Sequence, residues 1–255
     1  MSPDETPQFL TRQDGSRLAY RRIAGHGPGI VFLGGFMSDM TGAKATPLAS
    51  WAARRGRSLL RFDYAGHGLS DGDFADGTIG AWADDAILAL DRLTYGPQLL
   101  VGSSMGGWIM CLLARARPER VAGMVGVASA PDFTARLMEP DLDAGQRAAL
   151  AAGGQVLVPS QYADEPYVIT RALIEDGRRH LVLDAPLPVD APVRLIHGTA
   201  DTDVPWTLSQ ELLKRVTSAG ATLTLVKDGD HRLSAPRDLA RLVATLEDFI
   251  PLSRQ

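Results

Sequence analysis

The sequence is poor in cysteine, in clustered basic residues and in long apolar runs, and each shortage excludes a class of protein. Cys111 is the single cysteine among 255 residues, so neither an intrachain disulfide nor a metal site built from several cysteines can form. No apolar run approaches the roughly 18 residues that a membrane-spanning helix requires. The net charge of −4, without a basic stripe, argues against a nucleic-acid partner and against a membrane-surface partner.

Two further absences concern targeting and cofactors. Residues 1–7 are acidic and lack the apolar segment of a signal peptide. We therefore expect a cytoplasmic protein in a reducing compartment, with Cys111 as a small buried hydrophobic side chain. No Gly-x-Gly-x-x-Gly motif follows the first buried strand, which argues against a dinucleotide cofactor. No spacing of histidines and carboxylates indicates a metal site, so the sequence predicts neither a cofactor nor a metal.

Apolar runs alternate with helical patterns along most of the chain. This alternation is typical of an α/β fold with a mostly parallel sheet flanked by helices. The expected strands follow an opening β-hairpin at 9–21 and cover 30–33, 58–62, 99–101, 121–128, 193–196 and 222–226. The expected helices cover 44–55, 79–93, 206–218 and the C-terminal segment after Ser234.

The alternation is interrupted between residues 131 and 190. Prolines separate two helical patterns there, 144–152 and 167–176, and the strand pattern is weak. Long connections in regular α/β folds are often functional. We therefore predict a core made of residues 1–130 and 191–255, with a helical lid or cap of residues 131–190 inserted before the strand at 193–196.

A Gly-x-Ser-x-Gly pentapeptide, residues 102–106, stands between the strand at 99–101 and a helix-forming stretch. This order of strand, tight turn and helix is typical of a nucleophile elbow. Ser104, at its centre, would occupy a strained turn that crowds the residues two positions away, where only glycine lacks a Cβ. The pentapeptide alone fits a glycine-rich surface turn equally well, so the hypothesis depends on partners elsewhere in the chain.

A serine nucleophile needs a base and an orienting carboxylate, which follow such an elbow in the order Asp, then His. Asp201 lies on the loop after the strand at 193–196, and His231 lies on the loop after the strand at 222–226. We predict Asp201 as the acid and His231 as the general base. Asp201 could instead cap the next helix, which leaves Asp203 as the alternative acid. His67 and His197 are interpreted as structural.

An oxyanion hole requires two backbone donors. One is the N–H of the residue after the nucleophile, Met105. The second is expected from the loop after residue 33, where Phe36 is the first choice and Gly35 and Met37 are the alternatives. The groups together predict acyl transfer to water through an acyl-serine.

Four apolar side chains are candidates for substrate binding: Met37, Trp108, Met138 and Trp206. Methionine and aromatic side chains suit an acyl chain or an aryl group, although ordinary packing is an equally valid interpretation of each. The sequence thus predicts a serine hydrolase acting on small-molecule carboxylic esters or thioesters. The alternatives are a non-catalytic ligand-binding protein and a C–C bond hydrolase or perhydrolase with the same triad.

The elbow, the acid loop and the histidine loop together resemble the α/β-hydrolase superfamily over essentially the whole chain. Segments 35–45, 61–64, 102–108 with 116–119, and 205–206 with 230–232 narrow the resemblance. They are similar to the mitochondrial palmitoyl-protein thioesterases that also act as acyl-glucuronide esterases, and to their bacterial relatives. The resemblance implies the α/β-hydrolase fold and the same triad. It also implies hydrolysis of S-acyl thioesters, including S-acylated proteins or peptides, and of activated esters.

Overall fold

An eight-stranded sheet runs through the computed structural model, which describes residues 6–159 and 166–249. The strand order is β1-β2-β4-β3-β5-β6-β9-β10. β2 pairs antiparallel with both β1 and β4, and the other neighbours are parallel. The strands are β1 (Gln8–Thr11), β2 (Arg17–Ile23), β3 (His26–Leu33), β4 (Arg57–Phe62), β5 (Gln98–Ser103), β6 (Val121–Val127), β9 (Val193–Gly198) and β10 (Thr222–Val226).

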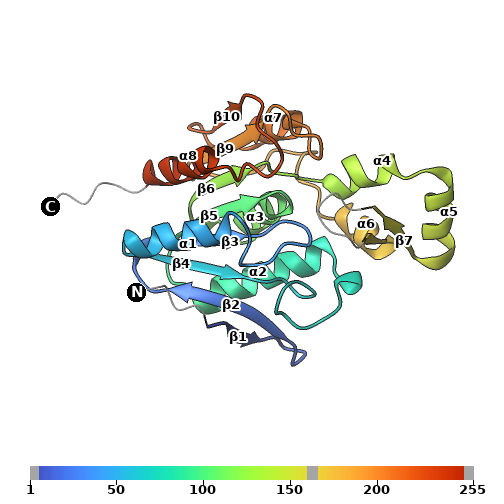
Figure 1. Cartoon of the computed structure of the whole chain (residues 1–255), viewed down its shortest axis with the longest axis horizontal. Helices are drawn as coiled ribbons and strands as arrows, with labels where there is room; N and C mark the ends of the chain where they lie inside the picture. The colour runs from blue at the N-terminus through green and yellow to red at the C-terminus, as the bar shows by residue number, and fades with distance from the viewer. Residues whose placement is uncertain (1–5, 160–165, 250–255) are drawn as a thin grey trace.

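Helices cover both faces of this sheet (Figure 1). One face packs against α2 (Ile79–Leu93), α3 (Met105–Ala116) and α7 (Trp206–Arg215), and the other against α1 (Ala45–Arg54) and α8 (Pro236–Glu247). Alternate side chains of β3 divide between these two cores, which explains its continuous apolar run at 30–33. The α/β fold with a mostly parallel sheet is confirmed.

The chain between β6 and β9, described at 128–159 and 166–192, is called the β6–β9 segment, and its base packs into one of the two cores. It lies at the end of the molecule away from both chain termini (Figure 1). It contains a π-helical turn (Thr134–Met138), α4 (Glu139–Asp141), α5 (Ala144–Gly153), the antiparallel pair β7 (Gln155–Val158) and β8 (Tyr167–Thr170), and α6 (Arg171–Gly177). Its own apolar cluster is small and consists of Leu142, Val156, Ile169 and Ile174.

The helix predicted at 167–176 is wrong over its first four residues. Tyr167–Thr170 pairs with β7 instead, and α6 begins at Arg171. The three consecutive β-branched residues 168–170 favour an extended backbone. The Thr170 hydroxyl then accepts the Leu173 N–H at 3.1 Å and caps the helix that follows.

One buried carboxylate joins the beginning of the β6–β9 segment to its end. Asp132 accepts the N–H groups of Val182 and Leu183, each at 2.9 Å. Burial raises the Asp132 pKa, and these two hydrogen bonds act against that rise. Arg136 adds ion pairs to Asp184 and to Glu211 of α7. The base of the segment is therefore tied to the core.

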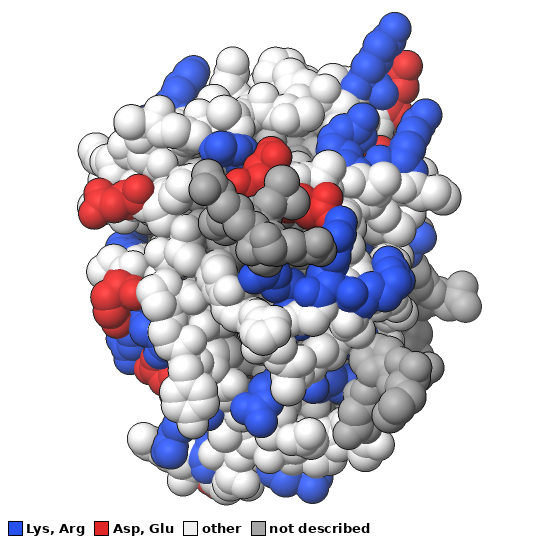
Figure 2. Space-filling model, turned by 90° about the vertical axis from the view of Figure 1, so that its left-hand side faces the viewer, with Lys and Arg blue, Asp and Glu red and all other residues white. Residues whose placement is uncertain are grey.

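Basic side chains predominate over acidic ones on the face that carries the chain ends, with neutral surface between them (Figure 2). Ion pairs join several arginines at this end of the strands to carboxylates: Arg55 to Glu247, and Arg117 and Arg120 to Asp91. None of the helices in the described ranges is long and apolar enough to cross a membrane.

Candidate active site

Ser104 stands at the turn between β5 and α3 with φ +54° and ψ −120°. This backbone conformation is strained for a residue with a side chain. The glycines on either side allow close packing, because a Cβ on Gly102 would overlap the Gly106 backbone and one on Gly106 would overlap the Leu33 carbonyl. The turn lifts the serine hydroxyl out of the sheet edge, at the N-terminus of a helix whose first ten residues are all buried.

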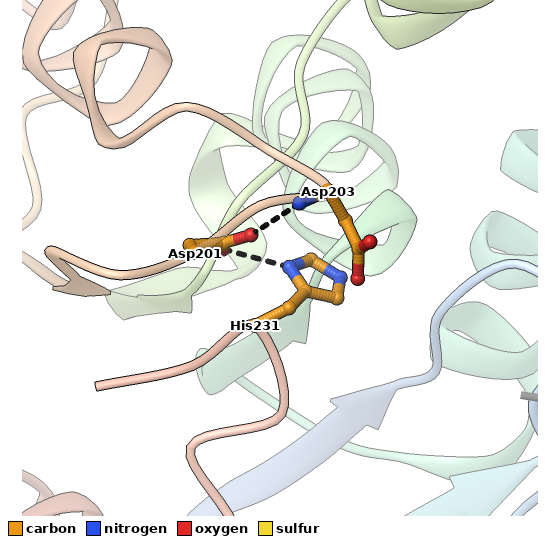
Figure 3. A group of neighbouring side chains, drawn as sticks. All are labelled: Asp201, Asp203 and His231. Atoms are coloured by element: carbon orange, nitrogen blue, oxygen red, sulfur yellow. Dashed lines mark hydrogen bonds and ion pairs between the residues drawn. The ribbon is translucent and has the colours of Figure 1, made fainter. Parts of the chain in front are cut away.

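Asp201 and His231 meet Ser104 from two other strand ends. His231 Nε2 lies 3.0 Å from Ser104 Oγ, and His231 Nδ1 lies 2.8 Å from Asp201 Oδ2. Figure 3 shows Asp201 and His231 pointing toward one another from their two loops. The structure therefore brings together the three residues predicted as nucleophile, acid and base.

The Asp201 carboxylate accepts hydrogen bonds at both oxygens. Oδ1 accepts the N–H groups of Asp203 and Val204 at 3.0 and 2.8 Å, and Oδ2 accepts from His197 as well as His231. Burial alone would raise the Asp201 pKa, but the hydrogen bonds from the two histidines, the electrostatic attraction of His231 and the Val204 N–H together hold the pKa far below its usual range. Asp203, the alternative acid, donates its N–H to Asp201, and His231 bonds to Asp201 (Figure 3).

The loop after β3 passes directly beside the serine. A Cβ added to Gly35 would lie 3.3 Å from the Ser104 Cβ. The Met37 N–H donates to His67 Nε2 at 3.2 Å, so it is not available to an oxyanion. No hydrogen bond within the described residues engages the Phe36 N–H. Of the three predicted donors, Met37 is thus occupied, and Phe36 and Gly35 remain.

The neutral imidazole ring of His67 fixes the conformation of this loop. Its Nδ1 lies 3.2 Å from the Ala65 carbonyl, which is an acceptor, so Nδ1 carries the proton and Nε2 accepts from Met37. Burial lowers the His67 pKa to about 4, against the hydrogen bond to Ala65. Met37 itself is held at φ +54°. The structural role predicted for His67 is therefore specific: it shapes the loop beside Ser104.

A cavity of about 710 Å³ opens over Ser104 and His231. The β6–β9 segment supplies one apolar wall, made of Phe133, Leu137, Met138, Leu142, Val158, Tyr167 and Ile169. Phe36 joins the two sides, with ring centroids 5.7 Å from both Phe133 and Tyr167. This size and lining suit an apolar chain or ring with its polar end at the serine.

The four predicted substrate-binding side chains divide into two pairs. Met37 and Met138 line the cavity, as do Phe36 and Met105. Trp108 is fully buried in the main core, where its indole N–H donates to the His180 carbonyl at 3.0 Å. Trp206 is half-buried at the start of α7, and neither tryptophan belongs to the cavity wall. A helical position next to the elbow indicated Trp108, but its side chain is covered by the β6–β9 segment, where its ring packs edge-on against Phe133 with centroids 5.6 Å apart.

Comparison with known proteins indicates the same protein family as the geometry of the elbow does. The model of the "Alpha/beta hydrolase family" matches residues 30–244. The chain belongs to this family. The mitochondrial palmitoyl-protein thioesterase ABHD10 of Mus musculus is 39% identical over 243 residues, which are 95% of this chain and 82% of the relative. The resemblance to that group of thioesterases is thereby confirmed.

Two solved structures extend the similarity to the whole fold. A putative hydrolase from Agrobacterium vitis superposes with a TM-score of 0.92 at 40% identity, covering 96% of this chain and 98% of that one. The alpha/beta hydrolase domain-containing protein 10 from mouse gives a TM-score of 0.88 at 38% identity, covering 96% of this chain and 98% of that one.

Lys44 is a cavity residue that the sequence did not indicate for this α/β hydrolase. It precedes α1, and its ammonium donates to the Arg232 carbonyl, next to His231. Burial lowers the Lys44 pKa to about 8, and the Asp230 carboxylate partly opposes this. No local pattern could have revealed it, because the contact joins residues 188 positions apart.

Asp201, Asp203 and His231 also offer one ligand atom each within 4.8 Å of one another, a spacing that a metal ion can use (Figure 3). Both His231 nitrogens are already engaged, by Asp201 and by Ser104. An ion would have to replace these hydrogen bonds. The donor set therefore fits the hydrogen-bonded triad of an α/β hydrolase better than a metal centre.

Proposed function

We propose that this α/β hydrolase cleaves carboxylic esters or thioesters through an acyl intermediate on Ser104. The observation that carries the proposal is the hydrogen-bonded order Ser104 Oγ, His231 Nε2, His231 Nδ1, Asp201 Oδ2, with separations of 3.0 and 2.8 Å. The order provides a nucleophile, a base within proton-transfer distance and a carboxylate that fixes the base.

In the first half-reaction, His231 Nε2 takes the hydroxyl proton while Ser104 Oγ attacks the carbonyl carbon. The negative charge that develops on the carbonyl oxygen is stabilised by the N–H groups of Met105 and Phe36. His231 then returns the proton to the departing thiolate or alkoxide, and the bond from the acyl carbon to that group breaks. Asp201 stabilises the imidazolium between these two transfers.

In the second half-reaction, water replaces the departed group. His231 takes a proton from the water as it attacks the acyl-serine carbonyl, and the same two N–H groups receive the charge. When the new tetrahedral species collapses, His231 protonates Ser104 Oγ and the carboxylic acid leaves. Every group that transfers a proton or stabilises a charge in these two half-reactions belongs to this chain, so the proposed reaction requires no cofactor.

Two observations support a substrate class, the lining of the cavity and the name of a relative. We propose that the β6–β9 segment acts as the predicted cap and holds the acyl chain against its apolar wall. The named relative from mouse is a palmitoyl-protein thioesterase, which supports S-acyl thioesters, on small molecules or on proteins and peptides, as substrates of this chain. A thiolate leaves more readily than an alkoxide, so the same triad serves both bond types.

Burst kinetics with a p-nitrophenyl acyl ester test the proposal, followed by a comparison of acyl thioesters with oxygen esters of equal chain length. We expect a burst of p-nitrophenol of one equivalent, and labelling of Ser104 by a fluorophosphonate. Ser104→Ala should abolish both, whereas Ser103→Ala, the matched change at the neighbouring serine, should keep the burst. Full turnover by Ser104→Ala, or ligand binding without turnover across esters and thioesters, would contradict the proposal.

A further inference from the structure

A second serine–histidine pair meets the same carboxylate. Ser209 Oγ lies 2.7 Å from His197 Nδ1, and His197 Nε2 lies 3.0 Å from Asp201 Oδ2. Two series of hydrogen bonds, Ser104–His231–Asp201 and Ser209–His197–Asp201, therefore have the same order of groups. Both end at the same atom, Asp201 Oδ2.

Burial decides which of the two serines can react. Ser209 and His197 are both 0% exposed. Ser104 and His231 line the cavity, and neither member of the second pair does. Because a substrate carbonyl has no access to Ser209 Oγ, the second pair acts only through Asp201.

The partners of the His197 ring assign its proton. Nε2 faces two acceptors, the Asp201 carboxylate and the Val204 carbonyl oxygen at 2.9 Å, so Nε2 is the protonated nitrogen. Nδ1 is then left to accept the Ser209 hydroxyl at 2.7 Å. Ser209 on α7 thus fixes the ring orientation, and the ring donates a hydrogen bond to the carboxylate.

We propose that His197, held by Ser209, is a positioning residue that sets the direction and basicity of the Asp201 carboxylate. The inference rests on the proposed function, in which neutral His231 accepts the Ser104 proton. A donor on Oδ2 withdraws negative charge from the oxygen that faces His231, which weakens the attraction between that oxygen and an imidazolium. Loss of the His197 donor should therefore move the acidic limb of the activity profile to a higher pH.

Other charged groups near this carboxylate stay constant in the test. Lys44 acts on Asp201 from the start of α1, and Asp230 and Arg232 flank His231 on its own loop. Asp203 follows on the acid loop and contacts Asp201 through its N–H. None of these is changed in the variants below, so a shift in the pH profile is attributable to the His197 donor.

The test compares the pH dependence of kcat/KM in His197→Leu and His197→Gln, with rates normalised to the Ser104 titrated by a fluorophosphonate. The leucine variant removes the donor, and we expect kcat/KM to fall about tenfold. The acidic limb of its profile should move up by about half a pH unit. Glutamine places an amide N–H near the former Nε2 position and should restore most of both quantities.

Two further variants keep the proposal falsifiable. Ser209→Ala frees the ring and should move the acidic limb in the same direction by a smaller amount. Leu212→Ala, a matched loss of buried volume on the same helix, should lower stability without moving the limb. The proposal is overturned if the limb stays in place in both His197→Leu and Ser209→Ala, or if Leu212→Ala moves it equally.

Failure of the proposed function gives a different result. It would appear as turnover in Ser104→Ala, or as fluorophosphonate labelling of Ser209 in place of Ser104, whatever the pH profile of the His197 variants. An unmoved limb with Ser104 still labelled overturns only the role of His197.

Discussion

The carboxyl ends of the sheet strands, which carry the triad and which we call the sheet edge, and the β6–β9 segment that faces them differ in how many buried contacts stabilise them. Residues 105–114 of α3 are all buried, whereas α5 has no buried residue. A large apolar core covers each face of the sheet, and the base of the segment joins one of them through Phe133 and Leu183, but the outer part of the segment has only a cluster of four residues. Local stability follows buried apolar contacts. The reacting groups are thus fixed by the large cores, whereas the outer part of the substrate-facing wall, with Leu142 and Ile169, is fixed by a small one.

This difference predicts that substitutions in the two regions change different kinetic quantities. Substitutions at the sheet edge should lower kcat and leave the preference between substrates unchanged, because they alter groups that touch the reacting atoms. Changes in the segment should act on the preference between acyl groups. Substitutions in the two regions test this division.

The largest effect is expected from Asp201→Asn, at the sheet edge. An amide cannot hold His231 in the tautomer that accepts the serine proton, and it cannot stabilise the imidazolium, so kcat should fall about 10,000-fold. Steady-state kinetics with a short p-nitrophenyl ester measures the loss.

Asp203→Asn is the matched control, since it removes the same charge two residues away while leaving the Asp203 N–H bond to Asp201 in place. Its loss should be less than about tenfold. If Asp203→Asn causes the larger loss, Asp203 is the acid and the assignment of Asp201 is wrong.

The sequence predicted the sheet edge well because its signals are local. The opening hairpin, the strand before Ser104 and the helix at 79–93 all occur where expected. The two loops of Asp201 and His231 were identified by their place after strands, and parallel strands bring such loops to one edge. The resulting distances of 2.8 and 3.0 Å are a consequence of topology.

The segment was predicted less well, since its structure depends on contacts between distant residues. Residues 167–170 carry a short β-branched run, but the partner that makes them a strand, 155–158, is not identified by any local pattern. Contacts between distant residues also explain what was missed at the sheet edge: the Met37 N–H is occupied by His67, 30 positions away, and Lys44 reaches Arg232. Side-chain direction likewise placed Trp108 in the core.

An intermediate effect is expected from Met138→Ala in the segment. Met138 lines the apolar wall, and shortening it removes contact with an acyl chain while leaving the triad unchanged. The ratio of kcat/KM for a long acyl ester to that for an acetyl ester should change about three- to tenfold, with kcat for the acetyl ester nearly constant.

Leu157→Ala is the control within the same segment, because Leu157 is 57% exposed and lies outside the cavity wall. Its acyl-length ratio should equal that of the wild type. A loss of kcat for all substrates in Met138→Ala would instead show that the segment positions the reacting groups, and the division between the two regions would be broken.

The smallest effect, on the free energy of unfolding, is expected from Lys44→Met. Lys44 is one of the polar residues that the core contributes to the cavity lining, together with Thr41 and Arg232. The Lys44 pKa is about 8 in the folded protein and 10.5 in the unfolded chain. Below pH 8 both states bind this proton, and the folded protein bears the cost of a partly buried charge. Between pH 8 and 10.5 the unfolded chain binds more protons, so the residue's contribution to the free energy of unfolding rises with pH.

Methionine removes this dependence. Lys44→Met should gain roughly 1 kcal/mol over the wild type near pH 7, after discounting the desolvation for partial exposure, and the gain should shrink toward pH 10. Urea denaturation at the two pH values measures the difference. Parallel stability curves for the two proteins would show that Lys44 is solvated in the folded state, and that the core side of the cavity bears no charge penalty.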